Sequence, residues 1–199
     1  MVGQRWFSKL ASVWREGGAL GVARRLWRFI HWRVRGRKNL VLFEFMLNKP
    51  VQIYPCKGEI NVRLLRPADM EQIRSTFFPL MDGDLQHDKE CFLEFESVPN
   101  PNRRCFVAEM DGQIVHYSWV TTGAPRYGCV VIGSGVAYIG PCFTLPQARG
   151  LGIYPHVLTV ILRSLQQEGF LKALIQAHKD NLPSIRGIEK AGFVRVVRK

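Results

Sequence analysis

Apolar and polar positions follow two periods along the chain, and they predict a mixed α/β fold from about residue 39 onward. β-Branched and aromatic residues around an Asn-Lys-Pro break predict one or two short strands in 39–54. Residues 60–69 predict a strand that leads into a helix. The segment 81–102 is polar, acidic and interrupted by prolines, which is typical of a short helix and a loop that line a substrate site.

The second half of the chain continues this alternation. Asp111 and Gly112 separate two apolar runs, and Asp-Gly between strands favours a tight turn, so we expect a hairpin of 106–109 with 114–120. The remaining elements are a strand pair in 130–144, a helix over 154–167, a buried strand over 173–177, a helix over 183–191 and a last strand over 193–197.

A basic arm precedes this domain. Residues 1–40 hold ten Lys and Arg against one acid, so they contribute +9 of the formal net charge of +12. Apolar residues recur at helical spacing over 20–34 while most arginines fall on other faces, which predicts a basic amphipathic helix. A shorter helix of the same kind is predicted upstream. We expect the arm and its short strands to span 1–57 and the main domain to span 58–199.

Several partners suit such an arm. Tryptophan and arginine in one helix suit an anionic membrane surface, where each basic residue contributes about 1 kcal/mol. The helix can equally pack on its own domain or on a second copy in a homodimer, and basic amphipathic helices also bind nucleic acid or acidic carrier proteins. We take an anionic membrane surface as the expected partner of residues 1–38, with nucleic acid least expected.

Cysteine usage and hydropathy exclude other classes. The five cysteines are odd in number, scattered and never in a CxxC pair, so neither a disulfide framework nor a zinc site is indicated, and no metal is expected. No apolar run reaches the roughly 18 uncharged residues that a membrane-spanning helix needs, and no secretory signal is evident. These features predict a cytoplasmic protein, peripheral on the inner membrane face.

The hexapeptide QARGLG, residues 147–152, carries the chemistry. It lies between a predicted strand and a predicted helix, where unpaired backbone N–H groups and the helix dipole favour an anion, most often a phosphate. Gly150 and Gly152 let the backbone approach a ligand closely, and Arg149 adds positive charge. The segment matches neither GxxxxGK[ST] nor GxGxxG.

This hexapeptide resembles the Q/R-x-x-G-x-G/A signature of the GNAT superfamily of acyl-coenzyme A dependent N-acyltransferases. Residues 181–193 are similar to that family's N-x-x-[AS] helix with its terminal Gly-Phe, and 62–73 resemble its opening strand and helix. The resemblance covers about residues 58–199. It implies a mixed, mainly antiparallel sheet with flanking helices and one splayed strand pair, to which the N-terminal helical arm is an addition.

The resemblance also implies a binding site for acetyl-coenzyme A or another acyl-coenzyme A. The signature loop would hold the pyrophosphate, the strand 138–145 would hold the pantetheine arm near a bulge at Pro141, and the 181–193 helix would close the cleft. The residues implied in cofactor binding are Phe143, Thr144, Gln147, Ala148, Arg149, Gly150, Leu151, Gly152, Asn181 and Ser184. Asn181 is equally a good helix cap.

The reaction implied is attack of an amine on the thioester. The family's usual acid is a tyrosine seven residues after the Asn, where this chain has Ile188, so the proton donor is open. We take Tyr138 and His116 as candidate catalytic bases on strands. Cys142 is not expected to act as a covalent relay, because a buried strand cysteine is usually inert. Further carboxylate candidates are Asp82, Asp84, Glu94 and Glu96.

The function expected is N-acyl transfer, most simply acetyl transfer, to the amine of a small molecule such as an amino sugar or a lipid-linked precursor. Two other functions stay open. One is long-chain acyl transfer from acyl carrier protein, which is acidic and would suit the basic arm. The other is a catalytically silent binding module, which the missing tyrosine would favour.

Overall fold

The computed structural model describes residues 39–81, 85–97, 100–123, 126–127 and 130–196. The chain divides into two compact units, Met1–Leu40 and Val41–Lys199. The helices expected in 1–38 and the carboxylates Asp82 and Asp84 lie outside the described residues. Within the described part of the chain, no helix is long and apolar enough to cross a bilayer.

The second unit is built on a seven-stranded sheet with the strand order β2-β3-β4-β7-β8-β1-β9. Its pairs are antiparallel from β2 to β7, whereas β7 and β8 are parallel. The expected mixed α/β class with a mainly antiparallel sheet is therefore confirmed. The strands are β1 (Leu40–Met46), β2 (Asn61–Leu64), β3 (Arg103–Met110), β4 (Gln113–Thr121), β7 (Val136–Thr144), β8 (Lys172–His178) and β9 (Val194–Arg195).

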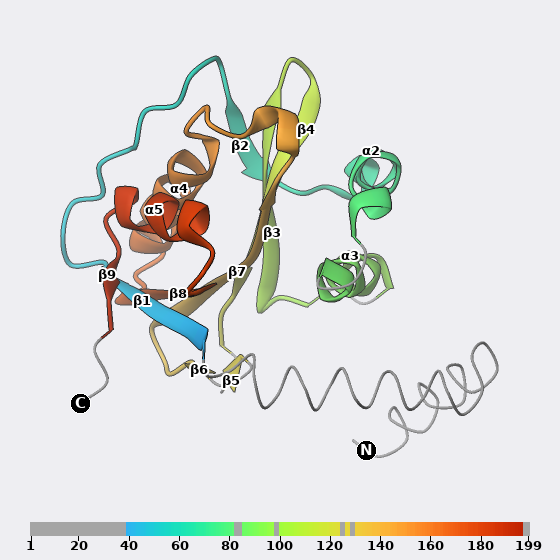
Figure 1. Ribbon diagram of the computed structural model, residues 1–199. Helices are drawn as coiled ribbons and strands as arrows, with labels where there is room; N and C mark the ends of the chain where they lie inside the picture. Colours follow the sequence, from blue (N-terminus) through green and yellow to red (C-terminus); the bar gives the residue numbers. More distant parts are fainter. Residues whose placement is uncertain (1–38, 82–84, 98–99, 124–125, 128–129, 197–199) are drawn as a thin grey trace. The chain divides into compact units, whose positions relative to one another are not determined.

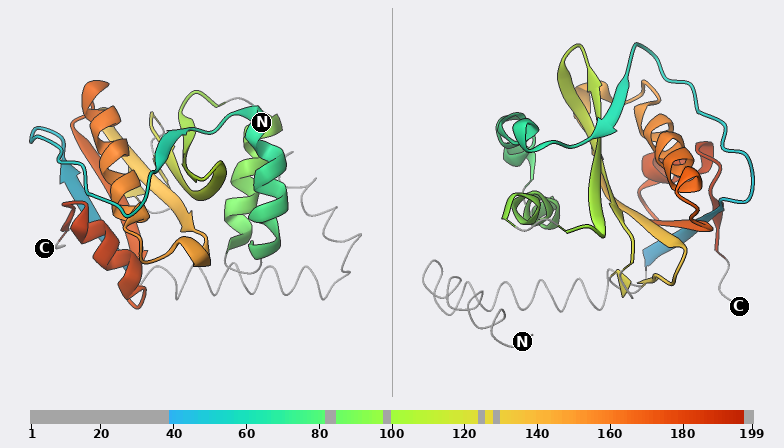
Figure 2. Two further views of the ribbon diagram at one scale, coloured as in Figure 1. Left: turned by 90° about the horizontal axis from the view of Figure 1, so that it is seen from above. Right: turned by 180° about the vertical axis from the view of Figure 1, so that it is seen from behind.

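Helices cover both faces of this sheet (Figures 1 and 2). On one face lie α2 and α3, which pack aromatic rings against β4: Phe92 meets Tyr117 and Trp119 edge to face at 5.0 and 5.2 Å. On the other face lie α4 and α5, and α4 buries eight residues of its apolar side. The helices are α2 (Met70–Thr76), α3 (Gln86–Ser97), α4 (Ile153–Gln167) and α5 (Leu182–Lys190), with short 3-10 turns at Pro67–Asp69, Phe78–Leu80 and Pro146–Ala148.

The expected hairpin forms between β3 and β4. Its turn residues Asp111 and Gly112 both have positive φ, 50° and 75°, which is the conformation that an Asp-Gly turn favours. The strand pair expected in 130–144 differs from the prediction. Val130–Val131 (β6) pairs with Arg126–Tyr127 (β5) in a separate two-stranded sheet, while β7 joins the main sheet.

Strand β1 lies inside the sheet, although the predicted domain boundary at residue 57 left it outside the main domain. It lies between β8 and β9 and pairs antiparallel with β9 through Phe43↔Arg195 and Glu44↔Val194. Phe43 is fully buried in the core. The compact unit accordingly begins at Val41.

The parallel strands β7 and β8 part in the middle of the sheet. Their pairing runs from Val136↔Lys172 to Ile139↔Ile175 and ends there, although both strands continue. On its other side β7 has a bulge, because Ser118 pairs with Cys142 and Val120 with Ile139, so that Gly140 and Pro141 together oppose one residue. The expected splayed pair and the bulge at Pro141 are both present.

One carboxyl group of α3, that of Asp88, is buried where the helix packs against β4. Asp88 is 4% exposed, and it accepts a 2.5 Å hydrogen bond from the Tyr117 hydroxyl. Burial raises the pKa of Asp88 to about 6, although the Tyr117 hydrogen bond and the Arg103 charge oppose the shift. Ionisation of this group therefore weakens the fold.

We predict that Asp88→Asn removes a pH dependence of stability. The folded protein binds more protons than the unfolded chain between pH 4 and 6, so the contribution of Asp88 to the free energy of unfolding falls as pH rises through that window, on the order of 2 kcal/mol in total. Urea unfolding at pH 4 and pH 7 measures it. The free energy of unfolding of the variant should rise relative to that of the wild type at pH 7 but not at pH 4. An equal rise at both pH values would contradict the assignment.

Candidate functional site

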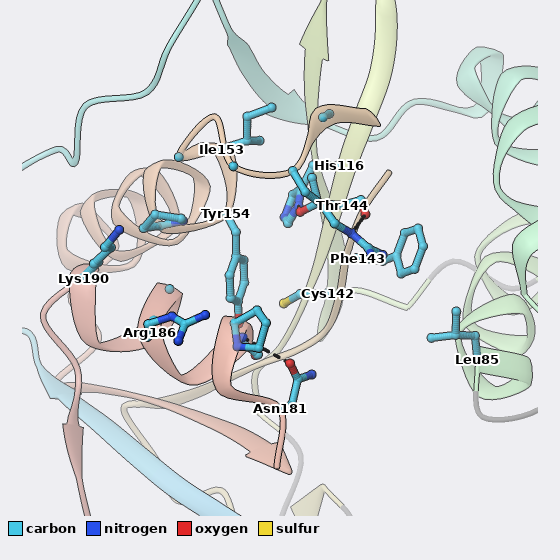
Figure 3. A pocket seen from close by; sticks show the side chains of 18 residues that line it. Leu85, His116, Cys142, Phe143, Thr144, Ile153, Tyr154, Asn181, Arg186 and Lys190 are labelled. Atoms are coloured by element: carbon cyan, nitrogen blue, oxygen red, sulfur yellow. Dashed lines mark hydrogen bonds between the residues drawn. The ribbon is translucent and has the colours of Figure 1, made fainter. Parts of the chain in front are cut away.

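A cavity of about 590 Å³ opens where β7 has left β8 (Figure 3). Its walls are the end of β7, the first turn of α4 and one side of α5, and its size suits a small-molecule ligand. Leu85 borders it from the start of the segment that carries α3. Among the expected site residues, those that line the cavity are His116, Phe143, Thr144, Ala148, Arg149, Gly150, Gly152, Asn181 and Ser184.

The loop between β7 and α4 presents unpaired backbone donors. Gly150 and Gly152 have φ of 80° and 81°, in the left-handed region that favours glycine. No hydrogen bond in the described part of the chain has the N–H of residues 150–154 as its donor. Pro155, which has no N–H, follows them inside the first turn. The helix therefore offers its positive end and a set of free amides to an anion.

A segment far away in the sequence holds this loop in place. The Lys57 amide donates to the Leu151 carbonyl at 2.8 Å, and the Tyr54 amide donates to the Thr159 hydroxyl at 3.0 Å. A Cβ on Gly152 would lie 3.2 Å from the Pro55 carbonyl oxygen, a tight contact, and the φ of 81° also favours glycine at this position. The segment 54–57 thus supports the loop and the helix that follows it.

The charged side chains along the cavity are all cationic. Arg186 and Lys190 lie one turn apart on α5, and neither forms an ion pair with a described residue. Across the cavity, the Arg149 Nε donates to the Thr144 carbonyl at 3.1 Å, and its guanidinium lies 5.4 Å from the centre of the Phe143 ring. No carboxylate is among the described lining residues. The electrostatics favour an anionic ligand.

His116 lies in the cavity wall with both ring nitrogens engaged. Its Nδ1 is 2.7 Å from the Thr144 hydroxyl and its Nε2 is 2.7 Å from the Ser118 hydroxyl, while the residue is fully buried. Burial lowers the pKa of His116 to about 3. A neutral imidazole with both nitrogens bonded is better suited to positioning Thr144 than to accepting a proton.

The other expected catalytic residues lie elsewhere. Tyr138 does not line the cavity and packs with the apolar cluster around Val130 and Leu174. Glu94 and Glu96 form ion pairs with arginines on the α3 side, away from the cavity. Cys142 does line the cavity, but burial raises the pKa of its thiol to about 12, so it is a poor nucleophile.

Three expected binding residues have other surroundings. Gln147 and Leu151 do not line the cavity; Gln147 is exposed, and Leu151 packs against the core. Asn181 borders the cavity and also caps α5, because its Oδ1 accepts from the Ser184 amide at 3.2 Å. Ile188 is fully buried in the core.

Among the lining residues that sequence reasoning missed, three carry a polar or charged group: Tyr154, Arg186 and Lys190. Tyr154 follows the signature loop by two positions, and the two cations stand at i and i+4 on α5, which puts them on one face. That spacing is a visible signal. The sequence does not show which face of α5 meets the cavity.

The sequence profile of the Acetyltransferase (GNAT) family matches residues 68–193, more than half of the chain. The chain belongs to the GNAT acetyltransferase family. No curated protein sequence matches it. The parted strands, the bulged β7 and the glycine loop before α4 are accordingly those of a GNAT domain, and β1 with the segment 47–57 precedes the matched residues.

Solved structures share the fold of this GNAT domain at low identity. The aminoglycoside acetyltransferase AAC(6′)-Iy, in complex with a bisubstrate analogue of coenzyme A and acetylneamine, has a TM-score of 0.57 and 19% identity over 71% of this chain and 95% of its own. AAC(6′)-Ih from Acinetobacter baumannii has a TM-score of 0.53 and 18% identity over 71% and 95%. A protein of unknown function from Staphylococcus epidermidis has a TM-score of 0.55 and 11% identity over 79% of this chain, which spans 57% of that protein.

We predict that His116 stays neutral from pH 5 to pH 8. Its depressed pKa, caused by burial, places its titration far below that window. Selective ¹⁵N-histidine NMR measures the ring nitrogen shifts, and exposed His178 serves as an internal reference signal. A midpoint near 6.5 for His116 would restore it as a candidate base.

Proposed function

We propose that this protein transfers an acetyl group from acetyl-coenzyme A to the amine of a small-molecule acceptor. The observation that carries the proposal is the set of amides at residues 150–154 without a hydrogen-bond partner, in a loop whose Gly150, Gly152, Ile153 and Tyr154 line a cavity without a described carboxylate. A diphosphate is the part of coenzyme A that such a helix end would bind. The family membership supports the same donor.

The parted strand gives the rest of the donor a path. Beyond Ile139 the β8 side of β7 no longer pairs, so the pantetheine arm can run along residues 140–144 from the loop toward the point where the strands diverge. Strand rise is about 3.3 Å per residue, so this stretch spans roughly 13 Å. The thioester would then lie beside Cys142 at the bulge, where backbone N–H groups can stabilise an oxyanion.

Arg186 and Lys190 favour coenzyme A over a carrier protein as the donor. A carrier's prosthetic arm has one phosphodiester, whereas coenzyme A has a diphosphate and a further 3′-phosphate. The α4 terminus and the two unpaired α5 cations supply two separate anion-binding groups along one cavity. Coenzyme A, with its diphosphate and its 3′-phosphate, would use both of these anion-binding groups.

The acceptor would enter past Leu85, on the side of the cavity away from the α5 cations. The described lining holds no carboxylate, and the pKa of its one histidine, His116, is lowered by burial, so the amine would lose its proton to water before it attacks. The structural neighbours that act on aminoglycosides make an amino sugar, free or in a lipid-linked precursor, a reasonable acceptor class.

We predict that the wild type binds acetyl-coenzyme A and releases free thiol in the presence of a primary amine. Calorimetry measures binding, and thiol release over a panel of glucosamine, neamine and spermidine measures transfer. In Arg186→Ala/Lys190→Ala, acetyl-coenzyme A should bind about tenfold or more weakly, since charge-assisted bonds to phosphate are lost.

The control variant is Lys179→Ala, which removes an exposed cation outside the cavity. It should bind as the wild type does. The double variant should also lose preference for coenzyme A over 3′-dephospho-coenzyme A. Binding without turnover on any amine would support the silent module, and preference for an acyl carrier protein would support the long-chain alternative.

We further propose that residues 1–38 hold the domain at an anionic membrane. The support is their charge and tryptophan content. A chain lacking residues 1–38 should lose sedimentation with vesicles of phosphatidylglycerol while keeping its affinity for acetyl-coenzyme A, and vesicles of phosphatidylcholine should bind neither form. Undiminished sedimentation of the shortened chain would refute the proposal.

A further inference from the structure

Tyr154 projects from the first turn of α4 into the cavity (Figure 3). Its ring reaches the space between Cys142 on β7 and the helix α5. Gly187 on α5 makes room for it, because a Cβ there would lie 2.5 Å from the Tyr154 Cδ1. The ring is therefore fitted between α4, α5 and β7, and its hydroxyl has a defined place.

That place is beside the bulge. The Tyr154 hydroxyl lies near the Cys142 thiol and the Ser184 hydroxyl, which both influence its pKa, so it is placed between β7 and α5. The Tyr154 ring also lies 5.8 Å from the His116 ring, centre to centre. A thioester next to Cys142, as the proposed donor path requires, would put its sulfur within reach of this hydroxyl.

Other lining groups with a proton are less suited to give it to that sulfur. His116 is neutral and bonded at both nitrogens, and the Thr144 hydroxyl is one of its partners. The Cys142 thiol is no stronger an acid than the coenzyme A thiol that it would have to protonate. Arg186 and Lys190 line the cavity but are exposed, and the proposed donor's phosphates would engage them.

We propose that the Tyr154 hydroxyl donates the proton that the departing coenzyme A sulfur takes up. The proposal rests on the acetyl transfer proposed above. The amine nitrogen forms a bond to the carbonyl carbon, the carbon–sulfur bond breaks, and its electron pair stays on sulfur, which receives the phenol proton. The nitrogen loses its surplus proton, which returns to the phenolate oxygen through Ser184 or water. With the proton lost before attack, one proton reaches solvent per turnover.

The surroundings of Tyr154 suit an acid rather than a base. Burial raises the pKa of Tyr154 well above its usual range, so the phenol is protonated at every working pH. The Ser184 hydrogen bond opposes this shift, since it stabilises the phenolate. The Ser184 hydroxyl thus stabilises the Tyr154 phenolate when the sulfur takes the proton.

Tyr154→Phe tests the proposal, because it removes the hydroxyl and keeps the ring. We expect kcat with acetyl-coenzyme A to fall about 100-fold, in the range of general acid catalysis, while the acetyl-coenzyme A Kd changes less than about twofold. The acceptor is the best amine of the panel, or water in a slow hydrolysis assay if no amine is turned over. Lys179→Ala, which changes an exposed residue outside the cavity, is the control and should stay within about twofold of the wild type.

A second donor separates acid catalysis from a structural role. In the selenium analogue of acetyl-coenzyme A, the leaving selenolate is much less basic and needs no proton, so Tyr154→Phe should lose less than about fivefold with it. An equal loss with both donors, or unchanged kcat with acetyl-coenzyme A, would overturn the assignment. If the wild type transfers acetyl groups to neither an amine nor water, the proposed acetyl transfer itself is refuted.

Discussion

The point at which β7 and β8 stop pairing is the constraint on which the site depends. Up to Ile139 and Ile175 the two strands hold each other in a parallel ladder, and beyond that register they diverge. The bulge at Gly140 and Pro141 turns β7 away from β8 while β4 continues to pair with it. One side of β7 is therefore anchored by β4, and on the other side its last residues line a cavity instead of pairing with β8.

Helix α4 completes a binding site where β7 and β8 diverge. Its apolar side is buried against the sheet, which fixes the direction of the helix and hence the place of its N-terminus. The glycine loop delivers the chain to that terminus without side chains in the way, and the segment 51–57 supports the loop from outside. Anion binding and the placement of Tyr154 follow from the same helix end.

Local signals predicted much of this arrangement. The hexapeptide 147–152, the bulge at Pro141 and the Asp-Gly hairpin each depend on neighbouring residues, and each lies where it was expected. The place of β1, the paired nitrogens of His116 and the face of α5 that carries Arg186 depend instead on segments that meet only in the folded chain. Periodicity shows that a helix has faces, but only packing decides which face looks into a cavity.

The position of β1 bears on how the chain reaches its folded form during synthesis. This strand leaves the ribosome first, yet its neighbours in the sheet, β8 and β9, are the last strands to be made. Until then Phe43 has no core to enter, and both edges of the strand lack their permanent partners. Closure of the sheet around β1 thus waits until β8 and β9 have been made, and until then the apolar strand β1 is exposed to non-native contacts.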